Sequence, residues 1–179
     1  MPFEELPHEG TWLQWPHNHT YGFGAADFEP TWIQMTEALV VGERVHIIAY
    51  DNVHKDHIVN VLEESLIDMS SVDFVIAKND DFWIRDNGPI FVYDSDVNLT
   101  ILDWGFNGWG GNAPFEFCDD IPIAVADSLN IPIVDLNAMV LEGGAFEIDG
   151  YGTLMATRTS ITGPDRNPGL SETQIEDYL

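Results

Sequence analysis

Two strand-type segments that flank a helix-type segment constrain the fold more than any other feature of this sequence. Residues 44–50 (RVHIIAY) and 72–77 (VDFVIA) are largely apolar, as buried strands are. Residues 53–66, between them, carry apolar side chains at helical spacing. A helix between two strands indicates a crossover unit, so we expect an α/β fold.

The remainder of the chain adds more strands than helices. The turn DGYG at residues 149–152 predicts a hairpin between the strands on either side of it. Near the end, Ser171 has Gln174 three residues on, which is the spacing of a capping box that starts a helix. The other expected strands are residues 11–15, 89–93, 99–104, 131–136, 139–141, 145–148 and 153–157, and the other expected helices are residues 28–41 and 119–129, the second interrupted by Pro122.

The order of these elements recurs loosely along the chain. The first group, which ends at Ala77, is a strand, a helix and a strand. The second group, which ends at Leu136, is a strand pair, a helix and a strand, and a third group begins at Met139. We interpret this order as a weak internal repeat. The chain stops about two turns into the helix that Ser171 begins, although a well-capped helix normally continues to a glycine or proline. We therefore expect an interrupted sequence.

Length and charge limit the classes of function. The chain has 179 residues, 45% of them apolar, which is enough for one domain or for part of one. Its 31 acidic and 6 basic side chains give a formal net charge of -25, spread along the whole chain. Such a charge repels nucleic acid and anionic membranes, so we expect neither as a partner. Two explanations of the negative charge remain open: it gives a strongly hydrated surface suited to a salty environment, or it attracts a cationic substrate.

Membrane segments and redox centres are not indicated by the sequence. A run of about 18 to 20 apolar residues, the length of a membrane span, does not occur, and the first ten residues lack the features of a signal peptide. We therefore expect a soluble, cytoplasmic protein. Cys118 is the single cysteine, so it has no partner for an internal disulfide. Its acidic neighbours would raise the pKa of its thiol, so we expect a structural role.

The densest group of chemically useful side chains is NDDFWIRDNGPIFV, residues 79–92. Asp80, Asp81 and Asp86 offer carboxylates, which hold a planar guanidinium through paired N–H bonds. Trp83 could stack on such a cation. The alternative is an acidic turn in which Arg85 forms a salt bridge, and spacing alone does not separate the two interpretations.

A second group is LEGGAFEIDG, in which Glu142 follows an apolar strand and precedes Gly143 and Gly144. Glycine backbones can turn tightly or approach a ligand closely. The alternative is a glycine bulge beside a solvent-facing glutamate.

The third group is the loop DWGFNGWGGN, residues 103–112, which has four glycines and two tryptophans. It lacks GxGxxG and a P-loop lysine, so we interpret it as a mobile loop that lines a site rather than as a phosphate-binding loop. A metal site is not expected in another part of the chain, where three histidines and two aspartates occur close together in sequence. These residues are His46, Asp51, His54, Asp56 and His57, and their spacing matches no zinc signature.

Five ordered blocks across almost the whole chain resemble the agmatine deiminase and bacterial-type peptidylarginine deiminase family. The blocks are TWLQWP, NDDFWIRDNGP, LDWGFNGWGG, LEGGAFEIDGYGTLMAT and RNPGLSETQIEDYL. The resemblance implies the pentein fold, an α/β propeller of five modules, of which about two and a half would be present in one partial domain, residues 1–179. It also implies hydrolysis of a guanidine such as agmatine to the N-carbamoyl compound, with release of ammonia and with no metal or organic cofactor.

The resemblance also assigns residues to roles. The RD motif maps to Asp86, which would bind the guanidinium, and the EGG motif maps to Glu142, which would belong to the carboxylate set around the guanidinium and the histidine. The residues expected to bind the substrate or shape its pocket are Asp80, Trp83, Trp104, Asn107, Trp109 and Gly110.

Two motifs of the family do not occur in these 179 residues. They are the histidine motif GHxD and the late cysteine motif that carries the nucleophile, and Cys118 does not fall at the nucleophile position. We therefore expect weak binding and no turnover from this chain alone, with a homo-oligomer or a C-terminal half as a possible partner. The alternatives are a non-catalytic guanidinium-binding module and a deiminase that acts on peptidyl arginine.

Overall fold

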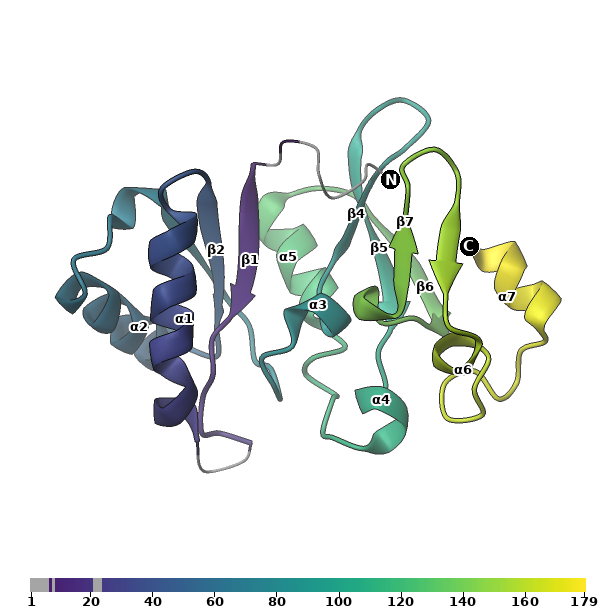
Figure 1. Ribbon diagram of the computed structural model, residues 1–179, viewed down its shortest axis with the longest axis horizontal. Helices are drawn as coiled ribbons and strands as arrows, with labels where there is room; N and C mark the ends of the chain where they lie inside the picture. Colours follow the sequence, from purple (N-terminus) through teal and green to yellow (C-terminus); the bar gives the residue numbers. More distant parts are fainter. Residues whose placement is uncertain (1–6, 8, 21–23) are drawn as a thin grey trace. The chain divides into compact units, whose positions relative to one another are not determined.

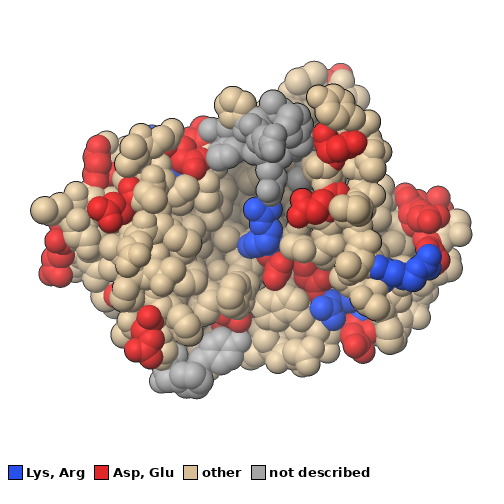
Figure 2. Space-filling view, in the orientation of Figure 1, with Lys and Arg blue, Asp and Glu red and all other residues tan. Residues whose placement is uncertain are grey.

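The computed structural model describes residues 7, 9–20 and 24–179. The described chain divides into two compact units, Pro7–Ile84 and Arg85–Leu179 (Figure 1). Acidic side chains occur at many separate points of the face shown in Figure 2, and basic side chains are few. Within the described residues, none of the helices combines the length and the apolar character needed to cross a membrane.

The Pro7–Ile84 unit is a three-stranded parallel sheet with two helices. Strands β1 (Gly10–Gln14), β2 (Arg44–Ala49) and β3 (Val72–Ile76) lie in the order β1-β2-β3. Helix α1 (Ala25–Leu39) connects β1 to β2, and α2 (Asn52–Glu64) connects β2 to β3. The crossover unit expected from residues 44–77 is confirmed.

The core of this unit forms between the sheet and both helices. Central strand β2 is buried along almost its whole length, because neighbours cover it on both sides. A 3₁₀ helix at Met69–Ser71 precedes β3. The buried core residues are Leu13, Trp15, Val45, Ile47, Ala49, Ile58, Leu62, Ile67 and Val72.

Helix α1 begins three residues before the expected start at Phe28. Gly24, in the left-handed region with φ 87°, precedes the helix and offers no side-chain cap. The missing acceptor comes from Asn18, whose Oδ1 accepts a hydrogen bond from the backbone N–H of Ala25 at 3.1 Å. Because this acceptor lies seven residues back, the usual local cap signal is absent from the sequence.

The Arg85–Leu179 unit contains a mixed sheet. Strands β4 (Ile90–Tyr93) and β5 (Leu99–Gly105) are antiparallel, and β5 pairs in parallel with β6 (Ile133–Val140). Helix α5 (Ile121–Leu129) connects β5 to β6. The expected strand pair at residues 89–93 and 99–104 is confirmed.

Two expectations for this unit are wrong. Residues 131–136 and 139–141 do not form two strands but one, β6, which continues through a shift of register: Trp104 pairs with Leu136 and Gly105 with Val140, so that the extra residues lie on β6. Helix α5 is not interrupted by Pro122, which lies in the first turn, where its missing N–H costs no hydrogen bond.

The end of the chain forms a hairpin and two helices. Strands β7 (Phe146–Ile148) and β8 (Leu154–Ala156) are antiparallel, as the DGYG turn predicts. Helix α6 (Arg158–Ile161) follows, and α7 (Glu172–Tyr178) begins with the expected capping box at Ser171. The buried residues that join β4, β5 and β6 to these helices are Ile90, Trp104, Met139, Leu141, Ile161 and Ile175.

Candidate functional site

Asp86 is the point at which three separate sequence blocks of the Arg85–Leu179 unit meet. It lies in the short helix α3 (Ile84–Asn87), which the sequence did not predict. Its Oδ2 accepts a hydrogen bond from Nε1 of Trp109 at 3.1 Å, and its Oδ1 accepts one from the backbone N–H of Gly144 at 3.2 Å. Both carboxylate oxygens are therefore oriented by fixed donors.

The two glycines of the EGG motif are required by lack of space. A Cβ at Gly143 would lie 2.3 Å from the backbone oxygen of Arg85, and a Cβ at Gly144 would lie 2.2 Å from Oδ1 of Asp86. A side chain at Gly143 would force the two backbone segments apart, and one at Gly144 would displace the Asp86 carboxylate. The motif thus places the 3₁₀ helix Gly143–Ala145 directly against α3.

Glu142 is buried rather than solvent-facing, so the alternative of an exposed glutamate is wrong. The residue is 3% exposed, and its Oε1 accepts a hydrogen bond from Nε of Arg166 at 2.5 Å. Burial raises the pKa of the Glu142 carboxyl, while the positive charge and hydrogen bond of Arg166 lower it and the negative charge of Asp86 raises it further. Asp86 and Glu142 therefore act electrostatically on one another.

The loop around α4 (Gly108–Gly111) forms another wall of this site. Asn107 joins it to the chain near Arg166: its Oδ1 accepts from the N–H of Gly110 at 2.8 Å, and its Nδ2 donates to the backbone oxygen of Asp165 at 2.9 Å. A Cβ at Gly110 would lie 2.7 Å from Cβ of Asp165. Three residues expected to shape the pocket, Asn107, Trp109 and Gly110, are thus gathered near Asp86 and Glu142.

Trp104 lies elsewhere in the same unit. It is 7% exposed and belongs to the hydrophobic core, where its ring meets that of Tyr178 edge-on at a centroid distance of 6.4 Å. The structure therefore gives Trp104 a packing role on strand β5.

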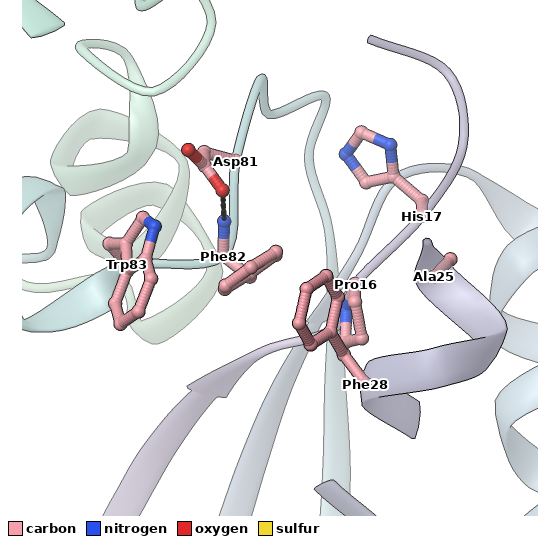
Figure 3. Close-up of a pocket in the computed structure, with 7 residues that line it drawn as sticks. All are labelled: Pro16, His17, Ala25, Phe28, Asp81, Phe82 and Trp83. Atoms are coloured by element: carbon pink, nitrogen blue, oxygen red, sulfur yellow. Dashed lines mark hydrogen bonds between the residues drawn. The ribbon is translucent and has the colours of Figure 1, made fainter. Parts of the chain in front are cut away.

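Asp80 and Trp83 belong to the Pro7–Ile84 unit. Asp80 is 6% exposed, whereas Trp83 is 50% exposed and lines a pocket of this unit (Figure 3). Neighbouring Asn79 is fully buried, and its Oδ1 lies 2.7 Å from Nε2 of His17. Asn79, which begins this segment after β3, is thus fixed by a side-chain hydrogen bond.

Asp86 and Glu142 give this site two carboxylates whose positions are set by hydrogen bonds. Glu142 pairs with the guanidinium of Arg166, and the negative charge of Asp86 acts on Glu142. Asp86 is only partly buried, so a ligand can reach it. Carboxylates with fixed geometry suit a planar cation that offers paired N–H donors.

Comparison with known proteins identifies the family of the chain. A family model described as Porphyromonas-type peptidyl-arginine deiminase matches residues 1–179. The chain belongs to this family. The resemblance expected from the five sequence blocks is confirmed.

Members of this deiminase family with curated names are about a third identical to the chain. The agmatine deiminase of Pseudomonas aeruginosa (strain LESB58) is 31% identical over 189 residues, which cover 100% of this chain and 50% of that protein. The agmatine deiminase of Pseudomonas putida is 30% identical, with coverage of 100% and 49%. The chain therefore spans about half the length of the curated relatives it matches.

A solved structure confirms the fold class of this deiminase-family chain. The agmatine deiminase of Enterococcus faecalis superimposes with a TM-score of 0.86 at 26% sequence identity, covering 100% of this chain and 49% of that one. The fold is accordingly α/β and of the pentein type that the resemblance implies.

Sequence reasoning missed one residue of the deiminase-family site, Arg166. It stands in the block RNPGLS, which was used only to recognise the family. A signal was available, because a basic side chain is rare in this chain, with 6 among 179 residues. Nothing local, however, connects Arg166 with Glu142, which lies 24 residues away.

Cys118 and the histidines that the structure describes do not join this site. Cys118 is 0% exposed in the apolar interior, in agreement with a structural role. Among the residues that the structure describes, no group of three or more histidine, cysteine or acidic side chains is arranged to hold a metal ion.

Proposed function

We propose that the chain is part of a hydrolase that converts a guanidine to a ureido compound and releases ammonia. The proposed substrate is agmatine and the product N-carbamoylputrescine, within putrescine biosynthesis in the cytoplasm. The observation that carries the proposal is the convergence of Asp86 and Glu142, both ordered by hydrogen bonds, in one unit of a deiminase-family chain.

Asp86 is the proposed partner of the guanidinium group. Trp109 and Gly144 each donate one hydrogen bond to its carboxylate, so its orientation is set before the substrate arrives. Glu142 supplies a second negative charge whose ionised form Arg166 favours. Together they favour the charged guanidinium over the neutral product, since a ureido group offers no positive charge to the carboxylates.

The walls of the pocket are assigned to further residues. Asn107 and Gly110 fix the α4 loop and thereby Trp109. Asp80 and Trp83 are also proposed to contact the substrate, whereas Trp104 contributes through packing.

The nucleophile is proposed to come from outside residues 1–179. Hydrolysis replaces one nitrogen of the guanidinium carbon by the oxygen of water, and the family resemblance assigns the first attack to a cysteine thiolate. Cys118 is fully buried, so it cannot reach a substrate. We infer that residues 1–179 form a partial pentein domain of about two and a half modules, completed by a further segment or by another subunit.

An alternative substrate is arginine within a peptide. The description of the matching family model names peptidyl-arginine deiminase, while the curated relatives are named agmatine deiminases. The two substrates share the guanidinium and differ in what is attached to it, so the carboxylates of this site do not discriminate between them.

The direct test is a chimera in which residues 1–179 replace the equivalent half of the Pseudomonas aeruginosa agmatine deiminase. We expect ammonia release from agmatine and a loss of roughly 100-fold in kcat/KM for Asp86→Asn. Asp127→Asn, an exposed change of equal charge, is the matched control. Release from an arginine peptide but not from agmatine would establish the alternative substrate.

Folding of the chimera must be checked by circular dichroism before its activity is interpreted. A folded chimera that binds agmatine and turns over no guanidine would instead indicate a non-catalytic guanidinium-binding module. A folded chimera that neither binds nor hydrolyses any guanidine would contradict the proposal.

A further inference from the structure

Four histidines of the Pro7–Ile84 unit line one cavity at the carboxyl end of its parallel sheet. The cavity has a volume of about 360 Å³, and its histidines are His17, His19, His54 and His57. The first two come from the segment that follows β1, and the other two come from helix α2, which begins after β2. The proposed hydrolysis gives none of these four side chains a role.

Hydrogen bonds determine which neutral form of His17 is present. Nδ2 of Asn79 donates to the backbone oxygen of Ala77 at 3.1 Å, so it is the acceptor Oδ1 of Asn79 that lies 2.7 Å from Nε2 of His17. Nε2 therefore carries the proton. Nδ1 accepts a hydrogen bond from the backbone N–H of His19 at 3.1 Å, which requires a free lone pair. His17 is thus neutral in this arrangement, and it joins the segment after β1 to the chain after β3.

His54 has the same neutral form. Its Nδ1 accepts a hydrogen bond from the backbone N–H of Tyr50 at 3.1 Å, and its ring forms a second hydrogen bond with the backbone of Pro16. Because a proline has no backbone N–H, the carbonyl oxygen of Pro16 must accept this bond from Nε2–H of His54. The ring of Tyr50 also packs against those of His17 and His19, at centroid distances of 4.9 and 3.9 Å. His54 thus joins the segment after β1 to the chain after β2.

A second proton on either ring would remove one of these hydrogen bonds. Nδ1–H of a charged His17 would face the N–H of His19, and Nδ1–H of a charged His54 would face the N–H of Tyr50, so that two donors meet. The ring centroids of His17 and His54 are 5.8 Å apart, and two charged rings would also repel each other. Burial is the main cause that lowers the pKa of both rings, to about 4 for His54. His57 and His19 lower the pKa of His54 as well.

Two carboxylates that line the cavity have other partners. Oε1 of Glu29, on helix α1, accepts a hydrogen bond from Nε1 of Trp15 at 3.0 Å and lies 2.7 Å from Nε2 of His57. Oδ1 of Asp51 caps helix α2, because it accepts from the backbone N–H of His54 at 2.8 Å. These contacts hold both carboxylates in place.

Two more carboxylates follow strand β3. The negative charge of Asp80 acts to raise the pKa of His17, but burial has the larger effect and the pKa is lowered. Asp81 lines a pocket with His17, and its Oδ1 accepts a hydrogen bond from the backbone N–H of Phe82 at 2.9 Å. Burial, rather than a neighbouring carboxylate, therefore decides the charge of His17.

We propose that His17 and His54 form an acid-sensitive clip. While both rings are neutral, the clip holds residues 16–20 across the carboxyl ends of the three strands, and protonation of both rings releases this segment. Pro16 and His17 also line the pocket that contains Trp83 (Figure 3), so the release removes one wall of that pocket. The clip thus makes the shape of the Pro7–Ile84 unit depend on pH.

The first test is nitrogen-15 NMR of the imidazole rings in the unsubstituted chain at pH 7. We expect both His17 and His54 to carry a single proton, on Nε2, because each Nδ1 accepts a backbone hydrogen bond. A proton on Nδ1 of either ring at this pH would overturn the proposal.

The second test is hydrogen exchange of the Tyr50 amide as a function of pH, corrected for the intrinsic exchange rate. A released histidine takes up its proton near pH 6.5, so release should not depend on pH above about 6.5 and should become more favourable below it. We expect the equilibrium constant for release to rise more than about tenfold between pH 6 and pH 5. The uptake of one proton cannot produce such a rise, whereas the uptake of two can.

Single variants identify the two rings. His17→Asn and His54→Asn each leave one titrating ring, and the asparagine oxygen can accept the backbone N–H in place of Nδ1. In each variant the rise should fall below about tenfold. His57→Asn is the matched control, since His57 lines the same cavity but pairs with Glu29, and it should keep the full rise.

A reference amide separates local release from unfolding of the whole unit. The N–H of Ser65, at the other end of helix α2, donates to the backbone oxygen of Val61 at 3.2 Å, and its exchange should not share this dependence on pH. An equal rise at Ser65, a rise below tenfold at Tyr50 in the unsubstituted chain, or a full rise in both single variants would each overturn the proposal. These measurements use no ligand and do not involve Asp86, so their outcome is independent of the proposed hydrolase activity.

Discussion

Nε of Arg166 donates a hydrogen bond to Oε1 of Glu142 at 2.5 Å, and the two side chains are only 17% and 4% exposed. A buried carboxylate without such a partner tends to take up a proton, because burial disfavours its charged form. Arg166 opposes that tendency and lowers the pKa of Glu142, which burial nevertheless leaves above its usual value. This pair connects the EGG motif with a block of sequence that carries no obvious chemistry of its own.

Removal of Arg166 is therefore expected to destabilise the chain. Arg166→Gln should lower the free energy of unfolding by about 3 kcal/mol at pH 7, because it leaves the Glu142 carboxylate buried and unpaired. Urea denaturation measures this change, and a carboxyl-carbon NMR titration should show a higher pKa for Glu142 in the variant.

A surface pair provides the control for this experiment. Arg158 and Glu172 also form an ion pair, with side chains 72% and 48% exposed. Arg158→Gln should change the free energy of unfolding by less than about 1 kcal/mol, as exposed pairs do. Equal changes in the free energy of unfolding for the two substitutions would show that the buried Arg166–Glu142 pair contributes no more to stability than the exposed pair.

Gly144 is expected to tolerate no side chain. A Cβ there would lie 2.2 Å from Oδ1 of Asp86, so Gly144→Ala should displace the Asp86 carboxylate and lower the free energy of unfolding by roughly 1 to 3 kcal/mol. Gly169→Ala is the control, since a Cβ at that position meets no atom within 4 Å. Urea denaturation of both variants decides the matter, and a Gly144→Ala variant as stable as Gly169→Ala would refute the role assigned to this close approach.

Local signals in the sequence predicted most of the regular structure. The apolar run of β2, the DGYG hairpin turn and the capping box at Ser171 each depend on neighbouring residues, and the structure confirms all three. The family resemblance rested on ordered blocks of the same kind, and the family is confirmed over residues 1–179.

Features that depend on distant partners could not be predicted in this way. The acceptor at the start of α1 is Asn18, the partner of Glu142 is Arg166, and the space that excludes a side chain at Gly144 is taken by Asp86. Helix α4 escaped prediction for another reason: Trp109 adopts the left-handed region, with φ 57°, which is uncommon for a tryptophan.

His54 is expected to make the stability of the Pro7–Ile84 unit depend on pH. Burial lowers its pKa to about 4, with a contribution from nearby His17, against about 6.5 in the unfolded chain. The unfolded state then binds the proton more readily, so this stabilisation is complete above pH 6.5 and is lost as the pH falls toward 4. Between pH 7 and pH 5 the loss should be about 2 kcal/mol.

The matched variant for this experiment is His54→Asn. Nδ1 of His54 accepts a hydrogen bond from the backbone N–H of Tyr50 at 3.1 Å, and the asparagine oxygen can accept it without titrating. Because the many carboxylates titrate in both proteins, the quantity to follow is the difference in free energy of unfolding between them at each pH. A difference that stays constant from pH 7 to pH 5 would contradict the buried, neutral state of His54.

The measurement that tests the central claim most directly is calorimetric titration of this chain with agmatine, compared between Asp86→Asn and the unsubstituted protein. We expect weak, saturable binding that Asp86→Asn weakens at least about tenfold, because a neutral amide replaces the carboxylate that receives the guanidinium. Asp127→Asn, which removes an exposed charge on α5, should leave binding unchanged. Equal affinities of the Asp86→Asn and Asp127→Asn variants would show that Asp86 is not the guanidinium partner and would contradict the account.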